Sequence, residues 1–437
     1  MKKPRSVKSL CEFIWHLEEK FDLMSFEIEG VRTWQYIRME IYYTLAYKLQ
    51  IFDAPSVQKT PFMKVVKYIK LLYSSIFHNP LGVKKCDVLF FASGGIKKIG
   101  EKYIDIYTSG LIDKLSEDKT VYEFRLSSEL IDSISVNSSN KYLDFILLHS
   151  FLFGRRKKLD RNSMTKVFTL EKYIVETLGI SLNLNNVFLG KVKNFLSHKK
   201  NYIKILKKLN PERIYIVQSY GFYAPLIDAA KELSIETVEL QHGTFSQYHL
   251  GYSFPVGIEE IKYFPNKFFV WNAFWKDFIK LPIEHNNLII SPSIYMKKEK
   301  EKYEKLEKNK DQVVILSQGA LSAQIAEEVL KYWNFFKTKQ LKYKLHPSEY
   351  TTWKNNTYVN ELRKYNNVEV LEDVDLYRLL ATSEIQVGVF STAIYEGLEF
   401  NCETILLDLP GIEYMQKLVE TSYASMIEDK MKEIKIV

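Results

Sequence analysis

Cysteine is scarce in this sequence, with only Cys11, Cys86 and Cys402 among 437 residues. The three lie far apart, and no two have the spacing of metal ligands. The pattern therefore argues against a disulfide framework and against a cysteine-based metal site. A reducing compartment fits this usage best, so we expect a cytoplasmic protein.

Long hydrophobic runs are also missing. No run reaches the ~18 apolar residues that a membrane-spanning helix needs, and the closest, residues 142–154, contains Asp144 and His149. The chain opens with Met-Lys-Lys, but Glu12 and His16 interrupt the stretch that follows, so no secretory core of ~7–15 apolar residues forms there. Peripheral contact with the inner face of the cell membrane stays open.

Several signature motifs are absent as well. The sequence has no zinc-finger spacing, no RNA-binding aromatic signature and no basic zipper, and we do not expect nucleic acid as a partner. It also lacks a Ser-His-Asp order, HExxH and GxxxxGKS. The formal net charge of +8 favours smaller anionic partners such as nucleotides, phosphorylated lipids or an acidic membrane face.

What the sequence does contain is enough apolar material for more than one core. Hydrophobic residues make up 46% and charged residues 26% of the chain, as in soluble globular proteins, and the length suggests two or three domains of ~100–200 residues.

Residues 1–85 have apolar side chains at helical spacing and predict a helical extension. Its second helix, 62–77, carries Lys64, Lys67 and Lys70. We favour a packed helix with a solvated lysine edge over a lipid-binding surface.

From Asp87 onward, short apolar runs alternate with helical stretches, which is typical of parallel sheets with crossover helices. A charge run at 297–310 separates two such series. The first predicts strands at 88–92, 121–124, 213–218, 237–240 and 268–271, with a helix at 225–233. The second predicts strands at 313–317, 341–345, 368–371, 385–389 and 404–407, with helices at 323–337, 377–381 and 392–400. We therefore predict an α/β protein with a helical extension (1–85) and two Rossmann-like domains (86–295 and 296–437) that face each other across a cleft.

Polar residues follow three predicted strands of the second domain, where ligands of open α/β sheets bind. Gln318 and Gly319 follow the first strand, and glycine there lets a backbone N–H approach a phosphate. Lys344 and His346 lie at the end of the next strand, which Pro347 terminates. This lysine and imidazole can neutralise a phosphate leaving group. A surface lysine and a structural histidine are the alternative.

The Ser391-Thr392 pair precedes a predicted helix and can cap it, which leaves free N–H groups and a positive dipole end for a phosphate. Glu396 follows one turn later and can accept hydrogen bonds from ribose or sugar hydroxyls. The alternative is an ordinary cap with a solvated glutamate.

In the first domain, Gln241, His242 and Gly243 follow a predicted strand, and His249 and Tyr252 continue the same loop. His242 is a candidate general base for an acceptor hydroxyl, because imidazole titrates near neutral pH. It can equally orient a substrate or stay structural.

Taken together, Lys344-Leu345-His346-Pro347 and Ser391-Thr392 resemble elements of bacterial capsule and lipopolysaccharide glycosyltransferases of the GT-B fold. They are similar to the nucleotide-binding pair of sialyl-, polysialyl- and Kdo transferases and of CDP-glycerol polyol-phosphate transferases. The resemblance implies that His346, Pro347, Ser391 and Thr392 contact the donor nucleotide. The loop Gln241-His242-Gly243, with His249 to Tyr252, is similar to a loop of capsule-type transferases, and Gly30-Val31, Trp34 and Arg38 are similar to their helical lead-in.

One element of the sialyltransferase pattern is missing: residues 87–271 contain no Asp/Glu-Asp/Glu-Gly triplet, so a CMP-linked donor and the identity of the base stay open. The resemblance implies transfer of a sugar from a nucleotide-activated donor to a surface-polysaccharide or lipid-linked glycan acceptor, with no cofactor or metal. On this hypothesis, Gln318, Gly319, Lys344, His346, Pro347, Ser391, Thr392 and Glu396 bind the donor, His242 is catalytic, and Gln241, Gly243, His249 and Tyr252 lie on the acceptor side. A polyol-phosphate transferase, a sugar-nucleotide 2-epimerase and a non-enzymatic scaffold of capsule assembly are the alternatives.

Overall fold

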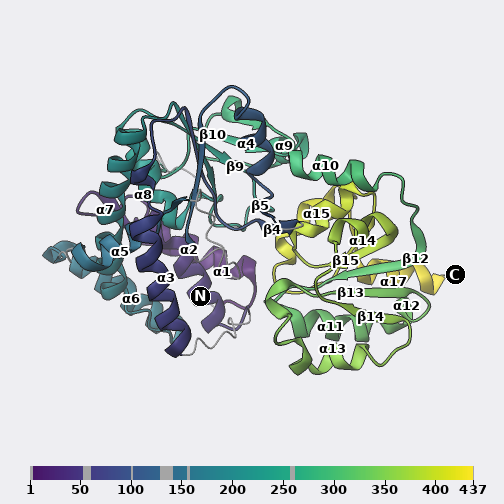
Figure 1. Cartoon of the computed structure of the whole chain (residues 1–437). Helices are drawn as coiled ribbons and strands as arrows, with labels where there is room; N and C mark the ends of the chain where they lie inside the picture. Colours follow the sequence, from purple (N-terminus) through teal and green to yellow (C-terminus); the bar gives the residue numbers. More distant parts are fainter. Residues whose placement is uncertain are drawn as a thin grey trace.

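The computed structural model describes residues 3–52, 61–99, 102–127, 141–154, 158–255 and 261–436. Two parallel sheets lie side by side, each covered by helices (Figure 1). The first has the order β11-β10-β9-β8-β3-β6-β7. Its strands are β3 (Val88–Phe91), β6 (Val121–Arg125), β7 (Lys141–Tyr142), β8 (Arg213–Val217), β9 (Glu236–Leu240), β10 (Lys267–Val270) and β11 (Leu288–Ile290).

The second sheet has the order β14-β13-β12-β15-β16-β17. Its strands are β12 (Asn309–Leu316), β13 (Gln340–Lys344), β14 (Val368–Leu371), β15 (Ser383–Gly388), β16 (Glu403–Leu406) and β17 (Ser425–Met426). In each sheet the chain starts at a central strand, moves outward to one edge, and returns to the other side of its first strand. This is the doubly wound Rossmann order, and the predicted fold class is confirmed.

The switch points of these two sheets lie between β3 and β8 and between β12 and β15. Loops diverge there, which leaves room for ligands beyond the carboxyl ends of the strands. The strands form because their residues suit burial on both faces; all four side chains of β3, Val-Leu-Phe-Phe, are buried.

The helices of the first half are α1 (Val7–Lys20), α2 (Thr33–Lys48), α3 (Pro61–Phe77), α4 (Ser109–Leu115), α5 (Asp144–Phe153), α6 (Arg161–Leu178), α7 (Leu184–Leu209), α8 (Ala224–Glu232) and α9 (Ala273–Phe278). Those of the second half are α10 (Ile294–Tyr303), α11 (Ser322–Lys331), α12 (Trp333–Phe336), α13 (Thr357–Leu362), α14 (Leu376–Thr382), α15 (Thr392–Glu399), α16 (Gln416–Glu420) and α17 (Ile427–Ile436). No helix among the described residues combines the length and apolar character needed to cross a bilayer.

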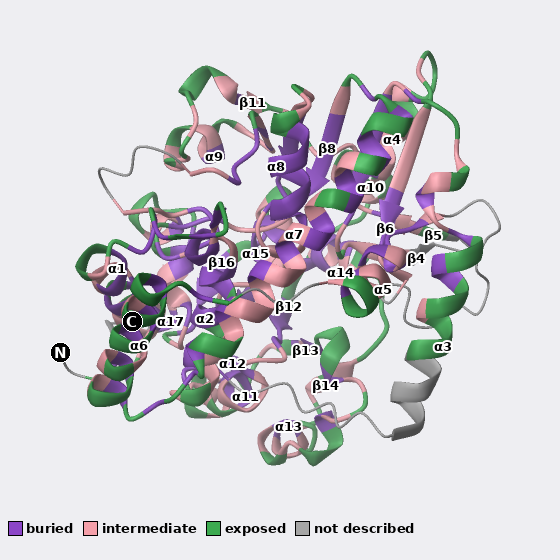
Figure 2. Ribbon diagram, turned by 90° about the vertical axis from the view of Figure 1, so that its left-hand side faces the viewer, coloured by how far each residue is buried: buried purple, intermediate pink, exposed green. Residues whose placement is uncertain are grey.

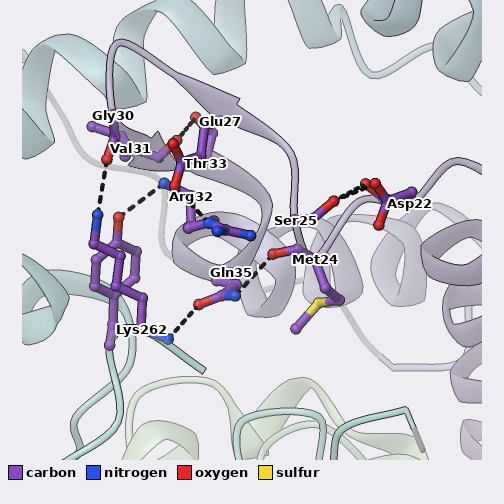
Figure 3. A network of polar contacts seen from close by, with 11 residues as sticks. Asp22, Met24, Ser25, Glu27, Gly30, Val31, Arg32, Thr33, Gln35 and Lys262 are labelled. Atoms are coloured by element: carbon purple, nitrogen blue, oxygen red, sulfur yellow. Dashed lines mark hydrogen bonds and ion pairs between the residues drawn. The ribbon is translucent and has the colours of Figure 1, made fainter. Parts of the chain in front are cut away.

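The N-terminal helices pack onto the first sheet's layer rather than standing apart. The small hairpin β1 (Glu27–Ile28) and β2 (Val31–Arg32) joins α1 to α2. Gln35 of α2 links Met24 to Lys262 through its side-chain amide (Figure 3). Its Nε2 donates to the Met24 carbonyl at 2.8 Å, and its Oε1 accepts from the backbone N–H of Lys262 at 2.9 Å. The Lys262 ammonium also donates to the Gly30 carbonyl, so this segment is fastened to the chain just before β10.

A buried ion pair strengthens the same attachment. The Arg38 guanidinium donates to both carboxylate oxygens of Glu18 at 2.9 Å, and the Trp34 indole donates to that carboxylate at 2.7 Å. Arg38 also donates to the Ser253 carbonyl at 2.8 Å. The lead-in residues Trp34 and Arg38 therefore hold the loop that follows β9.

Some sequence-based expectations differ from the structure. The predicted helix at 323–337 is interrupted at Tyr332, and the charge run is helical only through Tyr303, after which Asn309 begins β12. The expected packing of the apolar side chains of α3 is wrong for the described side chains, because most of them face solvent (Figure 2). The side chains of Lys64 and Lys67 lie outside the described part of this helix. The predicted domain boundaries stay predictions.

Candidate functional site

Two loops meet at the switch point of the second sheet. Gln318, just after β12, accepts a hydrogen bond at 3.1 Å from the backbone N–H of Phe390, just after β15. Gln318 is buried, and this contact sets the spacing between the two strand ends. The predicted ligand-binding Gln318 therefore at least positions the Ser391-Thr392 turn.

Gly319 lies directly against the His-Pro turn. A Cβ atom at this position would come within 2.1 Å of the Ser348 Oγ and 3.7 Å of the His346 Nδ1. Any larger residue at position 319 would therefore have to displace the Ser348 hydroxyl. The structure thus brings Gly319 and His346 together, as expected for two parts of one site.

His346 caps the short 3-10 turn Pro347–Glu349. Its Nδ1 accepts from the Ser348 N–H at 3.2 Å, while Glu349 accepts from the His346 N–H at 2.7 Å. Because Nδ1 is the acceptor, a neutral ring carries its proton on Nε2. Burial lowers the pKa of His346, the Glu349 carboxylate opposes that shift, and the Lys344 charge adds to it. Neighbouring residues desolvate His346 only in part, since the residue remains exposed to solvent, and its neutral ring can donate one hydrogen bond to a ligand through Nε2.

Lys344 is less available than the sequence suggested. Its ammonium is largely buried and donates to the Leu345 carbonyl at 2.7 Å and to the Tyr350 hydroxyl at 2.9 Å. Burial lowers its pKa to about 8. Lys344 is thus held in a local network and acts on a ligand mainly through its charge.

Ser391 is the N-cap of α15, as predicted. Its side chain accepts from the Ala393 N–H at 3.2 Å. The neighbouring Thr392 faces the first domain, since a Cβ atom on Gly243 would lie 3.7 Å from the Thr392 Oγ1. The N-terminus of α15 and the Gln241-His242-Gly243 loop therefore border one space between the two sheets.

Glu396 lies one turn further along α15 and accepts from the Tyr377 hydroxyl at 2.9 Å. The Lys97 ammonium lies 4.3 Å from the Tyr377 ring centroid. Burial raises the pKa of Glu396, and the charge of Lys97 and the Tyr377 hydrogen bond oppose that shift. Lys97 belongs to the hairpin β4 (Ile96–Ile99) and β5 (Lys102–Asp105), which reaches from the first sheet toward the second (Figure 1).

A cavity of about 880 Å³ opens beside Glu396. Residues from both halves of the chain line it, and many of them are aromatic: Tyr107, Trp271, Phe274, Trp275, Tyr295, Tyr377, Tyr395 and Tyr423. Aromatic faces with nearby carboxylates suit flat ligands that have both apolar faces and hydroxyl groups. Of the predicted donor residues only Glu396 lines this cavity, so the predicted phosphate position lies outside it, at the other end of the same helix.

His242 forms a chain of contacts with two residues of the first domain. The Tyr252 hydroxyl lies 3.4 Å from the His242 Nδ1 and donates to the Glu239 carboxylate. Glu239 is fully buried, and its Oε1 also accepts from the Ser219 N–H at 3.1 Å. Burial lowers the pKa of His242 to about 3, and His249 adds to that shift. The ring is therefore neutral at neutral pH, and one of its two nitrogens keeps an unprotonated lone pair.

The other predicted acceptor-side residues support this loop. Gln241 is buried and accepts from the Trp271 N–H at 2.9 Å while donating to the Gly243 carbonyl at 3.0 Å. The His249 ring packs against Tyr252, with centroids 4.9 Å apart. Burial lowers the pKa of His249 to about 4. Gln241 and His249 therefore shape the loop rather than project freely from it.

Sequence reasoning missed several residues at the carboxyl edge of the first sheet. Gly94 and Gly95 follow β3 with φ values of +67° and +69°, and a Ser-Gly-Gly turn after a buried strand is a signal that was available. Asp105 was not missed but was only an isolated candidate without a partner in the sequence; in the structure it accepts from the N–H groups of Tyr107 and Thr108, and burial raises its pKa to about 7. Lys97 and Glu239 carry no such local signal, because their neighbours come from distant segments.

No protein-family model matches this chain, and no curated protein matches it in sequence. Among solved structures it is similar to UDP-GlcNAc 2-epimerase from Methanocaldococcus jannaschii, with 12% identity over 80% of this chain and 91% of that chain and a TM-score of 0.46. UDP-GlcNAc 2-epimerase from Neisseria meningitidis has 12% identity over 78% of this chain and 86% of that chain, with a TM-score of 0.45. A glycosyltransferase from Rickettsia africae ESF-5 has 12% identity over 78% of this chain and 89% of that chain, with a TM-score of 0.41. Likeness at this distance assigns no activity, and the fold is defined by the chain's own strand order.

Proposed function

We propose that this chain is a glycosyltransferase that moves a sugar from a nucleotide-activated donor to a surface-polysaccharide or lipid-linked glycan acceptor. One observation carries the proposal: Gly319, His346 and the N-terminus of α15 converge at the switch point of the second sheet, opposite Gly243 of the first domain. A phosphate is the ligand that such a helix end, glycine and imidazole suit together.

In the proposed reaction, the donor phosphates bind the free N–H groups at the start of α15 and the Nε2–H of His346. The acceptor oxygen forms a bond to the anomeric carbon as the bond from that carbon to the phosphate oxygen breaks. The phosphate leaves with the electron pair, and the hydrogen-bond donors stabilise its charge. His242 takes the proton of the acceptor hydroxyl, while Tyr252 and Glu239 hold the ring in position.

Donor binding is tested with a thermal-shift panel of CMP, CDP, UDP, GDP and TDP, since a ligand that binds only the folded state raises its stability. The informative variant is His346→Asn. Asparagine can still cap the 3-10 turn but lacks the Nε2–H donor, so the unliganded unfolding temperature should change little while affinity for the preferred nucleotide falls about tenfold. His285→Ala, at an exposed position outside the site, is the control. Unchanged nucleotide binding in His346→Asn would contradict the assignment.

Turnover separates the proposed reaction from its alternatives. His242→Gln should retain nucleotide binding and reduce sugar transfer by ~10²–10⁴-fold, the usual contribution of a general base. Interconversion of a free UDP-sugar without any acceptor would identify an epimerase instead. Phosphorus retained in the transferred group would identify a polyol-phosphate transferase, and binding without turnover of any donor would leave a scaffold.

A further inference from the structure

In the described part of α3, large apolar side chains face solvent and two serine side chains face the protein, which is the reverse of the usual pattern in a soluble domain. Its outward face carries pairs of large apolar side chains one turn apart, each between 46% and 63% exposed: Tyr68, Ile69, Leu72, Tyr73, Ile76 and Phe77. Its inward face carries Ser74 and Ser75, which are buried. A helix that only covered a core would have the reverse pattern.

The serines explain how α3 packs in this orientation. The Ser74 hydroxyl donates to the Lys70 carbonyl at 2.9 Å and also bonds the carboxyl group of Asp144, at the start of α5. Asp144 is itself buried and accepts from the Ser127 hydroxyl at 2.8 Å. Polar contacts therefore hold the inner face of α3, and its apolar residues are left for another surface.

Helix α5 extends this apolar surface. It lies side by side with α3 (Figures 1 and 2) and ends in Phe151, Leu152 and Phe153, which are 71%, 57% and 68% exposed. Together, the exposed apolar residues of α3 and these three of α5 form what we call the α3–α5 patch. Large contiguous apolar surfaces of this kind mark sites of association.

On the described elements that flank the α3–α5 patch, namely α3 with the turn after it and α7, the charged side chains are basic. Residues 61–86 contain five lysines and no aspartate or glutamate, and Lys70, Lys84 and Lys85 are exposed. On the α5 side, Lys200 and Lys204 of α7 are exposed and close enough to act on His149, whose pKa is lowered by burial and then by these two charges. The only acidic residue of α5, Asp144, is buried. An apolar centre with a lysine rim complements a lipid surface with anionic headgroups.

We propose that the α3–α5 patch docks this chain onto a bilayer that contains anionic phospholipid. The aromatic and aliphatic side chains enter the boundary between headgroups and acyl chains, and the lysines contact the phosphates. This inference does not depend on the proposed function. If both hold, the docking surface belongs to the half of the molecule that receives the acceptor, as a lipid-linked acceptor requires.

The experiment measures cosedimentation of the full chain with vesicles. One set contains phosphatidylcholine alone, and the other contains roughly one third phosphatidylglycerol, a composition that gives a negative surface potential. We expect the wild type to bind the anionic vesicles, to bind the neutral ones more weakly, and to be released as salt screens the charges. Absence of binding to both sets would overturn the proposal.

Two matched variants locate the contact. Phe153→Ser should lower binding at least fivefold, because one large side chain no longer leaves water. Phe168→Ser is the control, since Phe168 has the same 68% exposure but belongs to α6, which lies away from α3 in Figure 2. Lys70→Glu should weaken binding to the anionic vesicles only. Equal losses in Phe153→Ser and Phe168→Ser would contradict the assigned surface.

A protein partner is the competing occupant, and a lipid-free experiment identifies it. Self-association in sedimentation velocity that Phe153→Ser abolishes would show that the patch joins two copies of the chain, and would replace the membrane proposal. Because both phenylalanines are exposed, the two variants should unfold within ~0.5 kcal/mol of wild type. A loss of vesicle binding then reports the surface rather than the fold.

Discussion

At the residue scale, the Glu239 carboxyl group is buried in a way that changes its protonation. It is fully buried, and its Oε2 has no hydrogen-bond partner among the described residues. Burial raises its pKa from 4.5 to about 7, with the Ser219 and Tyr252 hydrogen bonds opposing the shift. The folded protein therefore holds this proton in a pH range where the unfolded chain has already lost it.

The consequence is a stability that falls as pH rises. Between pH 4.5 and about 7 the unfolded state binds fewer protons, so the contribution of Glu239 is complete below pH 4.5 and is lost by about pH 7. The change amounts to about 3 kcal/mol over this range. Glu239→Gln carries no such proton. Urea unfolding from pH 4 to 8 measures the free energy of unfolding of both proteins. The value for Glu239→Gln minus that for the wild type should rise with pH, and a constant difference would refute this assignment.

Arg38 and Arg32 form two ion pairs in the same helical region that should behave very differently. The side chains of Arg38 and Glu18 are 3% and 0% exposed, whereas those of Arg32 and Glu27 are 28% and 41% exposed. Arg38→Ala leaves a buried carboxylate without its countercharge and should cost ~3–5 kcal/mol of unfolding free energy. Arg32→Ala should cost less than ~1 kcal/mol. Denaturant unfolding measures both, and similar costs would mean that the buried pair stabilises the fold no more than the exposed pair.

At the element scale, replacing each of two helical glycines by alanine should change the stability of the fold in opposite directions. A Cβ atom at Gly397 of α15 would lie 2.0 Å from the buried Gln386 Oε1, whereas Gly190 of α7 has nothing within 4 Å of that position. Gly397→Ala forces α15 away from β15 and should cost ~1–3 kcal/mol. Gly190→Ala should stabilise the chain by ~0.5–1 kcal/mol through helix propensity. Thermal unfolding tests both signs, and a stabilising Gly397→Ala would show that α15 does not pack closely on its strand.

The same helix shows why part of the site was predictable. Ser391 follows an apolar strand and precedes a helix, and such a cap is a local pattern. The His346-Pro347 turn and the ten predicted strands of the two sheets were also found from local patterns, because buried parallel strands are continuous apolar runs.

Other elements escaped prediction because their contacts are not local. The strands of the hairpin β4–β5, Ile-Lys-Lys-Ile and Lys-Tyr-Ile-Asp, do not alternate apolar and polar residues, yet the hairpin brings Lys97 to Tyr377. Helix α3 has the composition of a packed helix, and only its buried Ser74 and Ser75 reveal the direction in which it faces. Lys344 was expected to face a ligand, but its ammonium donates to the Tyr350 hydroxyl six residues later, a contact that depends on the 3-10 turn between them.

At the scale of the whole molecule, the two sheets share one apolar cluster. Phe245, Phe268 and Trp275 from the first half pack with Leu316 and Tyr395 from the second. We therefore expect the chain to unfold in guanidinium as one cooperative unit, with coincident transitions by circular dichroism and by tryptophan fluorescence. Two separated transitions would show that the halves are independently stable.

The close approach of Gly243 to Thr392 also has a consequence for binding kinetics. Both residues border the space where a donor phosphate is expected, and a Cβ atom on Gly243 would reach the Thr392 Oγ1 at an ordinary van der Waals distance. The Tyr42 and Tyr414 hydroxyls, 2.6 Å apart, tie α2 to the second half of the chain nearby. We expect these loops to part before a nucleotide binds, so its observed association rate should level off at high concentration instead of rising linearly with it. The rate at the plateau is then the rate at which the unliganded protein opens. It is a property of the chain and does not depend on which nucleotide binds.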